Sequence, residues 1–162
     1  MSPAIHKATL APDPTSETGS IAVLAVSAGA EIYGFPLSSI REILVPPPIA
    51  EVPRAPAPVL GVIAVRGQII TLVDLPSLLN LETVQPEGYG RVLLVDNGEE
   101  LIGVAVDRVI QVYRMEPKQI EYASAMGAEL SEYVVGVGRV PTEGEADDQM
   151  LILIDPVSLL GG

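Results

Sequence analysis

Few side chains in this sequence could carry out chemistry. The 162-residue chain has no Cys and a single His, His6. Protein zinc sites are usually built from Cys and His, and a thiol nucleophile requires Cys, so the composition provides neither. A Ser-His-Asp triad would depend on His6, which lies in a proline-punctuated stretch near the N-terminus where order is not expected. We therefore expect no metal site, no cofactor and no catalysis by a thiol or a Ser-His-Asp triad.

Three aspartates, Asp74, Asp107 and Asp155, are the carboxylates to weigh as acid catalysts, since paired acids can hydrolyse glycosides. Asp74 and Asp155 each end an apolar run and precede a Leu-rich turn with Pro just inside it. This is the pattern of a helix N-cap, so we interpret both as structural caps. A small β-barrel that uses Asp74 and Asp155 for ligand binding or hydrolysis is the alternative. The acidic stretch 143–148 lacks the ligand spacing of a calcium loop and is expected to be a solvated hairpin loop.

Charge and hydropathy exclude further classes of partner. Nine basic residues against 21 acidic ones give a net charge of −12, which repels a phosphate backbone and argues against nucleic acid. The best apolar run, Ile21 to Ala30, is about half of the roughly 20 residues that a bilayer requires. We expect no direct membrane insertion, and the absence of Cys is compatible with the reducing cytoplasm as the location.

Short apolar runs separated by turn signals predict an all-β domain over residues 20–162, after a flexible leader at 1–19 that holds three prolines. The predicted strands are Ile21–Ser27, Glu31–Leu37, Ile43–Val45, Leu60–Arg66, Gln68–Val73, Arg91–Asp96, Glu99–Val106, Val109–Met115, Tyr133–Val140 and Met150–Ile154. Asp96-Asn97-Gly98 is a strong hairpin signal, because Asn-Gly readily takes positive φ.

The chain also contains an internal repeat. The similar segments are Ile70–Leu79 and Leu151–Leu160 at a spacing of 81, Glu31–Phe35 with Ile40 and Ile43 and Glu100–Val104 with Val109 and Val112 at a spacing of 69, and Leu60–Val62 and Val135–Val137 at a spacing of 75. The common order predicts two similar halves of five strands. Small sheets of this kind close into barrels, which removes their exposed edges. We expect two β-barrel subdomains side by side with short helical turns, at about 20–82 and 88–162, with room for a terminal strand to cross between them.

Two local patterns between the predicted strands are informative. Arg66-Gly67 lies between apolar runs and predicts a two-residue hairpin turn. Its arginine must reach solvent or pair with a carboxylate, because an unpaired buried guanidinium is costly. Ser38 to Ile43 predicts one helical turn that leads into a strand, and 46–58, with six prolines in 13 residues, predicts an extended wrapping segment.

Taken together, these residues resemble the CheW-type coupling proteins of bacterial chemosensory arrays. The resemblance runs from about Ile21 to Leu160 and is carried by Tyr33-Gly34-Phe35, Ile40-Arg41-Glu42-Ile43, Pro56-Ala57-Pro58-Val59-Leu60-Gly61-Val62, Val65-Arg66-Gly67, Leu72-Val73-Asp74-Leu75, Gly103-Val104-Ala105-Val106-Asp107-Arg108-Val109 and Gly136-Val137. The family fold is two five-stranded barrels, which agrees with the repeat. Leu60 and Ala64 depart from the family pattern, which often has a basic and a polar residue at these positions.

The resemblance implies a non-enzymatic adaptor in the cytoplasm. Its partners would be the regulatory domain of a CheA-type histidine kinase and the cytoplasmic hairpin tip of a methyl-accepting chemoreceptor. The alternative within the family is an isolated regulatory module of such a kinase. The residues expected to bind partners are Ile40, Glu42, Ile43, Val62, Val65 and Arg66.

Overall fold

The computed structural model describes residues 19–81, 89–123 and 132–161. These residues form mostly strands. The elements are β1 (Ile21–Ala28), β2 (Glu31–Pro36), η1 (Leu37–Ser39), β3 (Ile40–Leu44), β4 (Val59–Val65), β5 (Gln68–Asp74), α2 (Leu75–Leu78), β6 (Arg91–Asp96), β7 (Leu101–Val106), β8 (Arg108–Met115), η2 (Pro117–Gln119), β9 (Ile120–Tyr122), β10 (Val134–Val140), β11 (Gln149–Ile154) and α4 (Pro156–Leu160). The predicted leader at 1–19 lies almost entirely outside the described residues.

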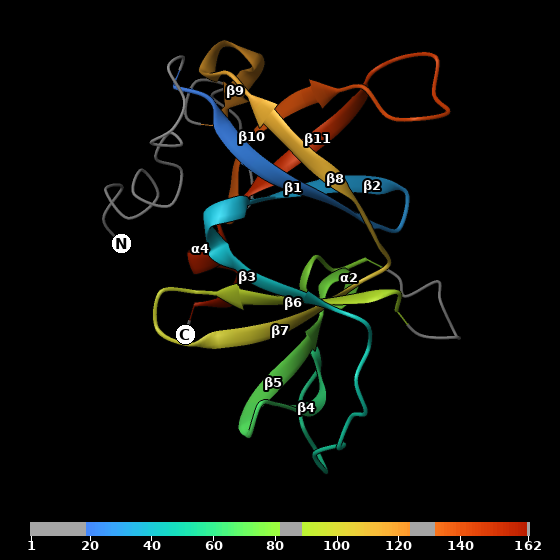
Figure 1. The fold of residues 1–162 in the computed structure, drawn as a ribbon, viewed down its shortest axis with the longest axis vertical. Helices are drawn as coiled ribbons and strands as arrows, with labels where there is room; N and C mark the ends of the chain where they lie inside the picture. Colours follow the sequence, from blue (N-terminus) through green and yellow to red (C-terminus); the bar gives the residue numbers. More distant parts are fainter. Residues whose placement is uncertain (1–18, 82–88, 124–131, 162) are drawn as a thin grey trace.

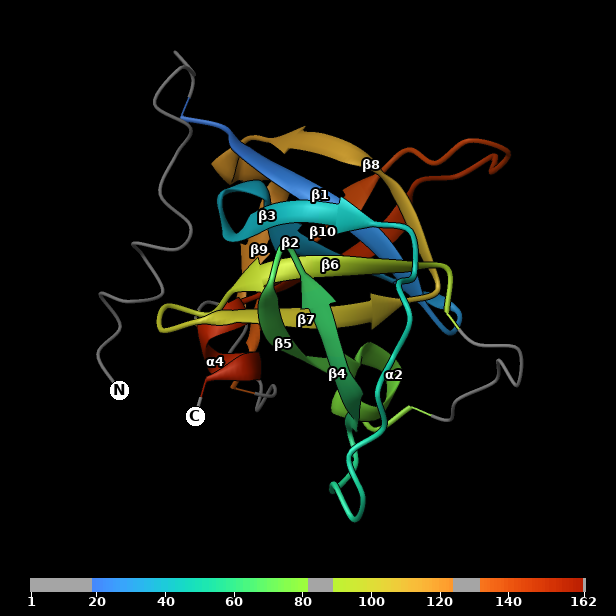
Figure 2. The ribbon, with the colours of Figure 1, turned by 60° about the horizontal axis from the view of Figure 1, so that its bottom comes forward.

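The strands form two sheets, one in each of two β subdomains (Figures 1 and 2). Subdomain A is the six-stranded sheet in the order β8-β1-β2-β11-β10-β9, and subdomain B is the five-stranded sheet in the order β3-β6-β7-β5-β4. Neighbouring strands are antiparallel except β2 with β11 and β5 with β7, which are parallel. The all-β prediction with two similar subdomains is confirmed, although the sheet of subdomain A has six strands rather than the expected five.

The subdomains do not follow one another along the chain, so the expected limits of about 20–82 and 88–162 are wrong. Subdomain A combines β1 and β2 with β8 to β11, whereas subdomain B consists of β3 to β7. Figure 1 shows β3 leaving the sheet of β1 and β2 for the other subdomain, and β8 crossing in the opposite direction. Each half of the chain thus adds its third strand to the first strand of the other half, β3 to β6 and β8 to β1. This exchange covers an edge that each half would otherwise expose.

The register of the strands confirms the internal repeat. Gly34 pairs with Leu153 in subdomain A, and the repeat-related Gly103 pairs with Leu72 in subdomain B. The register shift that precedes Gly61 in the pairing of β4 with β5 recurs before Gly136 in the pairing of β10 with β11. The strand missed in the sequence, β9, has only three residues. Its counterpart in subdomain B is an isolated bridge between Ala50 and Val62, because the surrounding prolines cannot donate ladder hydrogen bonds.

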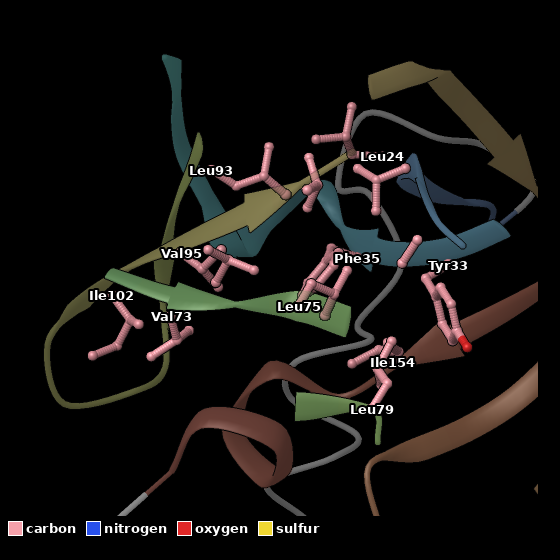
Figure 3. Close-up of a cluster of buried hydrophobic side chains, with 14 residues drawn as sticks. Leu24, Tyr33, Phe35, Val73, Leu75, Leu79, Leu93, Val95, Ile102 and Ile154 are labelled. Carbon is pink, nitrogen blue, oxygen red and sulfur yellow. The ribbon is translucent and has the colours of Figure 1, made fainter. Parts of the chain in front are cut away.

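Within the residues that the structure describes, the buried apolar side chains form three clusters. One lies inside each subdomain, and the third lies between them and takes side chains from both (Figure 3). Leu24 and Phe35 reach this shared core from subdomain A, and Leu75 and Leu93 reach it from subdomain B. Strands β1 and β6 place alternate side chains in the shared core and in their own subdomain's core, which explains their nearly continuous apolar sequences. Full burial of one such Leu or Phe side chain stabilises the fold by about 1.5–3 kcal/mol.

Two aspartates begin the short helices that follow the parallel strands, as the sequence predicts. The Asp74 side chain accepts hydrogen bonds from the Ser77 amide (3.2 Å) and hydroxyl (2.8 Å) at the start of α2. Asp155 does the same at the start of α4, with the Val157 amide (3.0 Å) and the Ser158 hydroxyl (3.0 Å). Both carboxylates are buried, so each satisfies amides that would otherwise have no partner.

The caps give a first prediction. Asp155→Ala and Asp74→Ala should each lower the free energy of unfolding by about 1–2 kcal/mol in denaturant titrations, because each leaves helix amides without an acceptor. Asp148→Ala, in the exposed loop between β10 and β11, is the control and should change stability by less than about 0.5 kcal/mol. Equal stability of all three variants would show that the caps are dispensable.

The two repeat-related glycines give a second prediction. A Cβ at Gly61 would collide with the Ala50 carbonyl oxygen, and one at Gly136 would approach the Glu121 carbonyl oxygen at 2.5 Å. Gly61→Ala and Gly136→Ala should therefore each cost about 1–3 kcal/mol of stability, since neighbouring backbone must move apart. Gly144→Ala, where a Cβ meets nothing within 4 Å at a φ of +85°, isolates the smaller cost of positive φ. Thermal unfolding of the three variants checks the ranking.

Candidate functional site

An ion pair joins the two ends of the subdomain B sheet. Glu42 lies on β3, at one end of the strand order, and Arg66 lies in the turn between β4 and β5, at the other. The Arg66 Nη2 donates to the Glu42 Oε1. The arginine side chain is 72% exposed and the glutamate 34%, so the pair adds little to stability and remains accessible to a partner. The sequence predicted that Arg66 reaches solvent or pairs with a carboxylate, and in the structure it does both.

The backbone of Arg66 explains how its side chain reaches this place. Val65 pairs with Gln68, which leaves a two-residue turn in which Arg66 has a φ of 49° and Gly67 a φ of 80°. Such turns match the twist of a hairpin but require positive φ at both central residues. For Arg this costs about 1–2 kcal/mol relative to Gly. Because Arg at this exposed turn costs stability relative to Gly, we infer that its side chain has a role other than stabilising the fold.

Strand β3 presents different residues on its two faces. Glu42 and Leu44 lie on the face of the sheet that carries the subdomain B core, whereas Ile40 and Ile43 lie on the face that carries the shared core. Ile43 is 43% exposed, and Val45, just beyond the strand, is 73% exposed. Glu42 and Ile43, which the sequence analysis grouped in one motif, therefore lie on opposite faces of the strand. Within the described residues β3 pairs with β6 alone, so its other edge offers free backbone donors and acceptors.

Val62 and Val65, the other two residues expected to bind partners, have structural surroundings. The Val62 amide and carbonyl both bond Ala50 at 2.9 Å, so the proline-rich segment covers this part of the β4 edge. Val65 is half-buried and packs against the subdomain B core, and Ile40 packs against the shared core. The structure thus brings Glu42 to Arg66 and gives Ile40, Val62 and Val65 packing or pairing roles beside them.

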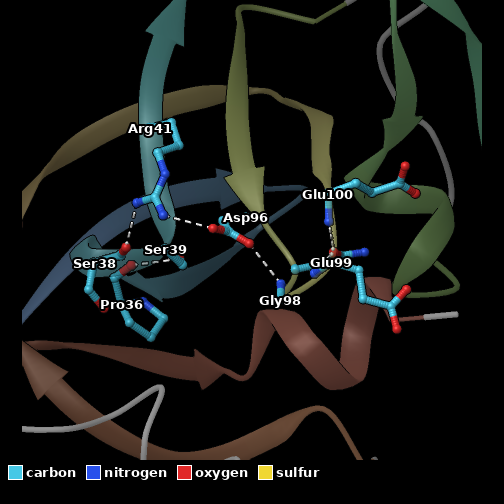
Figure 4. A network of polar contacts seen from close by, with 9 residues as sticks. Pro36, Ser38, Ser39, Arg41, Asp96, Gly98, Glu99 and Glu100 are labelled. Carbon is cyan, nitrogen blue, oxygen red and sulfur yellow. Dashed lines mark hydrogen bonds and ion pairs between the residues drawn. The ribbon is translucent and has the colours of Figure 1, made fainter.

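A second ion pair lies next to Glu42 and was missed in the sequence. Arg41 Nη2 contacts Asp96 Oδ2 at 2.7 Å, and its Nη1 donates to the Ser38 carbonyl oxygen at 3.2 Å (Figure 4). Asp96 Oδ1 in turn accepts a hydrogen bond from the Gly98 amide at 2.8 Å. Asp96 was recognised only as part of a hairpin turn. The partner of Asp96 could be found only by knowing that β3 pairs with β6, because Arg41 lies 55 residues earlier in the chain.

The same turn holds the end of the chain against subdomain B. Asn97 is buried, and its Nδ2 donates to the Leu160 carbonyl oxygen of α4 at 3.0 Å. Its Oδ1 accepts from the amides of Glu99 and Glu100, both at 2.9 Å. Asn97 therefore shapes the β6–β7 turn and fixes α4 with one side chain.

The outer faces of the two subdomains have diverged although the repeat relates them. On subdomain A a hollow of about 770 Å³ is lined by charged residues of η2, β9, β10 and the loop before β11, together with Met150. The charged residues are Lys118, Glu121, Arg139 and Asp148. In subdomain B the positions related to Arg139 and Met150 are Ala64 and Ile69, and Ile69 is 67% exposed. At these two positions subdomain B therefore carries apolar side chains only, whereas subdomain A carries the charge of Arg139.

The three aspartates weighed as acid catalysts each bond a backbone amide. Asp107 Oδ2 accepts from the Gly29 amide at 2.9 Å, and Asp74 and Asp155 cap helices as described. Among the residues that the structure describes, no group of three or more His, Asp or Glu lies together in an arrangement that could hold a metal ion.

Two tyrosine phenols have a shifted pKa. Burial and then the Glu31 carboxylate raise the pKa of the Tyr33 phenol above its ordinary value, and burial raises the pKa of Tyr89. Both phenols therefore stay neutral at physiological pH. In the described part of the chain, no helix is long and apolar enough to span a bilayer.

Proteins of similar sequence and fold show to which family the chain belongs. The chain is similar to the chemotaxis protein CheW of Klebsiella aerogenes, with 28% identity over 89% of this chain and 84% of that protein. It is also similar to the chemotaxis protein CheW of Helicobacter pylori, with 27% identity over 68% of this chain and 67% of that protein. The crystal structure of the scaffolding protein TtCheW from Thermoanaerobacter tengcongensis superposes with a TM-score of 0.72 at 23% identity, covering 88% of this chain and 94% of that one. The sequence model of the CheW-like domain matches residues 22–162, and the chain therefore belongs to the CheW-like family.

Proposed function

We propose that this protein is a non-enzymatic adaptor that couples the cytoplasmic tip of a chemoreceptor to the regulatory domain of a CheA-type histidine kinase. In this proposal it works in the cytoplasm and reaches receptor arrays through its partners. The observation that carries the proposal is the exposed Glu42–Arg66 ion pair beside an open strand edge, in a chain of the CheW-like family.

Three features of subdomain B suit such a role. Strand β3 offers an unpaired edge, which can accept a strand of a partner. Ile43 and Val45 add exposed apolar surface on its outer side, which can receive the apolar anchors of an amphipathic receptor helix. Glu42 and Arg66 supply opposite charges that fix the register of that helix and exclude wrongly charged partners.

The central test is binding to the two proposed partners. The purified chain should bind a CheA-type regulatory domain with a dissociation constant on the order of micromolar, measured by titration calorimetry. It should also co-sediment with receptor tips in the presence of that kinase. An absence of binding to the kinase domain and the receptor tips, alone and together, would contradict the proposal.

Charge reversal at Glu42 tests the site itself. Glu42→Lys should weaken one of the two contacts by about tenfold or more, because it removes the partner of Arg66 and places two cations together. The free energy of unfolding should change by less than about 1 kcal/mol, since the pair is exposed. Glu51→Lys, an exposed acid in the proline-rich segment, is the matched control and should bind normally. Equal weakening by both variants would assign the effect to net charge.

The strained turn separates folding from function. Arg66→Asn should leave stability unchanged or raise it by about 1 kcal/mol, because Asn adopts positive φ more readily than Arg. The same substitution should weaken partner binding severalfold, since the cation is lost. Thermal unfolding and calorimetric titration of this one variant measure both effects. A variant that loses stability and keeps affinity would contradict the role assigned to the Arg66 side chain.

A further inference from the structure

We propose that Arg41 and Asp96 form a register lock, which holds β3 so that Glu42 rather than Ile43 faces Arg66. Both are positioning residues, and the functional consequence rests on the function proposed above. The lock acts on the strand that carries Glu42 and does not itself require contact with a partner.

The lock sits at an irregularity in the pairing of β3 with β6. Ile40 pairs with Val95 and Glu42 pairs with Leu94, so Arg41 is an extra residue without a partner in the ladder. A residue inserted in this way is a β-bulge, which bends the strand and re-aims its side chain. At Arg41 the guanidinium turns back along β6 to Asp96, the last residue of that strand.

The position of this bulge decides which side chains face inward. Side chains alternate along a strand, so a slip of one residue moves every one of them to the opposite face. The bulge immediately precedes Glu42. If β3 paired with β6 without it, Glu42 and Ile43 would exchange faces, and the carboxylate would point away from Arg66. The ion pair that characterises the site therefore depends on the bulge remaining at Arg41.

Three contacts fix the bulge from both sides. Arg41 holds Asp96 at 2.7 Å and the Ser38 carbonyl oxygen in η1 at 3.2 Å. Asp96 is itself held, because its second carboxylate oxygen accepts the Gly98 amide at 2.8 Å. The contacts connect the start of β3 to the turn at the end of β6 (Figure 4).

The repeat provides a comparison within the same molecule. In subdomain A the corresponding bulge lies on β8, where Val109 pairs with Val26 and Gln111 pairs with Ala25, which leaves Ile110 as the extra residue. Ile110 is partly buried and packs against the subdomain A core, so apolar packing holds this bulge. The positions related to Glu42 and Asp96 are Gln111 and Ser27. The bulge is thus common to both subdomains, whereas the ionic lock belongs to the subdomain that carries the Glu42–Arg66 pair.

An ion pair on the surface weakens as the salt concentration rises, whereas apolar packing does not. The Arg41 side chain is 53% exposed and that of Asp96 is 34% exposed. Such pairs contribute little to global stability and weaken in salt. Loss of the lock should therefore loosen β3 while the two sheets stay folded.

The test compares two full-length variants that each lose one acidic charge on the same turn. Asp96→Asn removes the charge that faces Arg41 and keeps a side-chain oxygen for the Gly98 amide. Glu99→Gln, whose exposed side chain lies on the same turn, is the matched control. Amide hydrogen exchange of residues 40–44, the unfolding midpoint, and the affinity for a CheA-type regulatory domain are measured for both.

In Asp96→Asn we expect the β3 amide hydrogens to exchange about fivefold faster than in the wild type. We expect the dissociation constant for the regulatory domain to rise about fivefold, with an almost unchanged unfolding midpoint. Arg41→Gln should have the same effects, and the double variant should add nothing to either. Wild-type protein in about 1 M salt should approach the exchange rates of Asp96→Asn. Glu99→Gln should match the wild type in all three measurements.

Unchanged exchange in the β3 amides of Asp96→Asn, or equal changes in Glu99→Gln, would overturn the register lock. The exchange measurement requires no partner, so it decides the lock even if the regulatory domain fails to bind the wild type. That failure would overturn the proposed function alone. Faster exchange with unchanged affinity would keep the lock as a structural device and reject its link to docking.

Discussion

The rest of this structure depends on the exchange of strands between the two halves of the chain. Each half begins with a hairpin and sends its next strand to the hairpin of the other half, so each sheet contains strands from both halves. The first strands of the two hairpins, β1 and β6, are thereby paired on both sides and buried on both faces. The shared core lies where the two sheets meet, and the site lies on one of the exchanged strands. Its position is therefore set by contacts far apart in the sequence.

This arrangement explains which features the sequence could predict. The strands, the Asn-Gly turn, the two helix caps and the Arg66-Gly67 hairpin are local, and alternation or turn chemistry is enough to locate them. The repeat also related Gly34 to Gly103 and Leu72 to Leu153, and the register agrees with it, because Gly34 pairs with Leu153 and Gly103 pairs with Leu72. The three-residue β9 was missed because so short a run carries no periodicity.

The partners of each strand could not be predicted in the same way. Two similar halves are equally compatible with two consecutive barrels and with an exchange of strands, since both arrangements bury the same apolar residues. The choice determines that Arg41 meets Asp96 and that Glu42 and Arg66 lie at opposite ends of one sheet. Glu42 and Ile43 face opposite sides in either arrangement because side chains alternate along a strand, and the position of the bulge decides which of the two faces inward. Because the ion pairs of the site depend on this topology, the site was the part of the structure that the sequence predicted least well.

The proline-rich segment before β4 makes the two edges of the subdomain B sheet different. This segment pairs with β4 through Ala50 alone, and six of its thirteen residues have no amide hydrogen to offer. It therefore covers that edge with backbone on which another strand cannot grow. Within the described residues, β3 is left as the edge of this sheet open to strand addition, so an assembly that grows by adding strands to subdomain B can extend in one direction only.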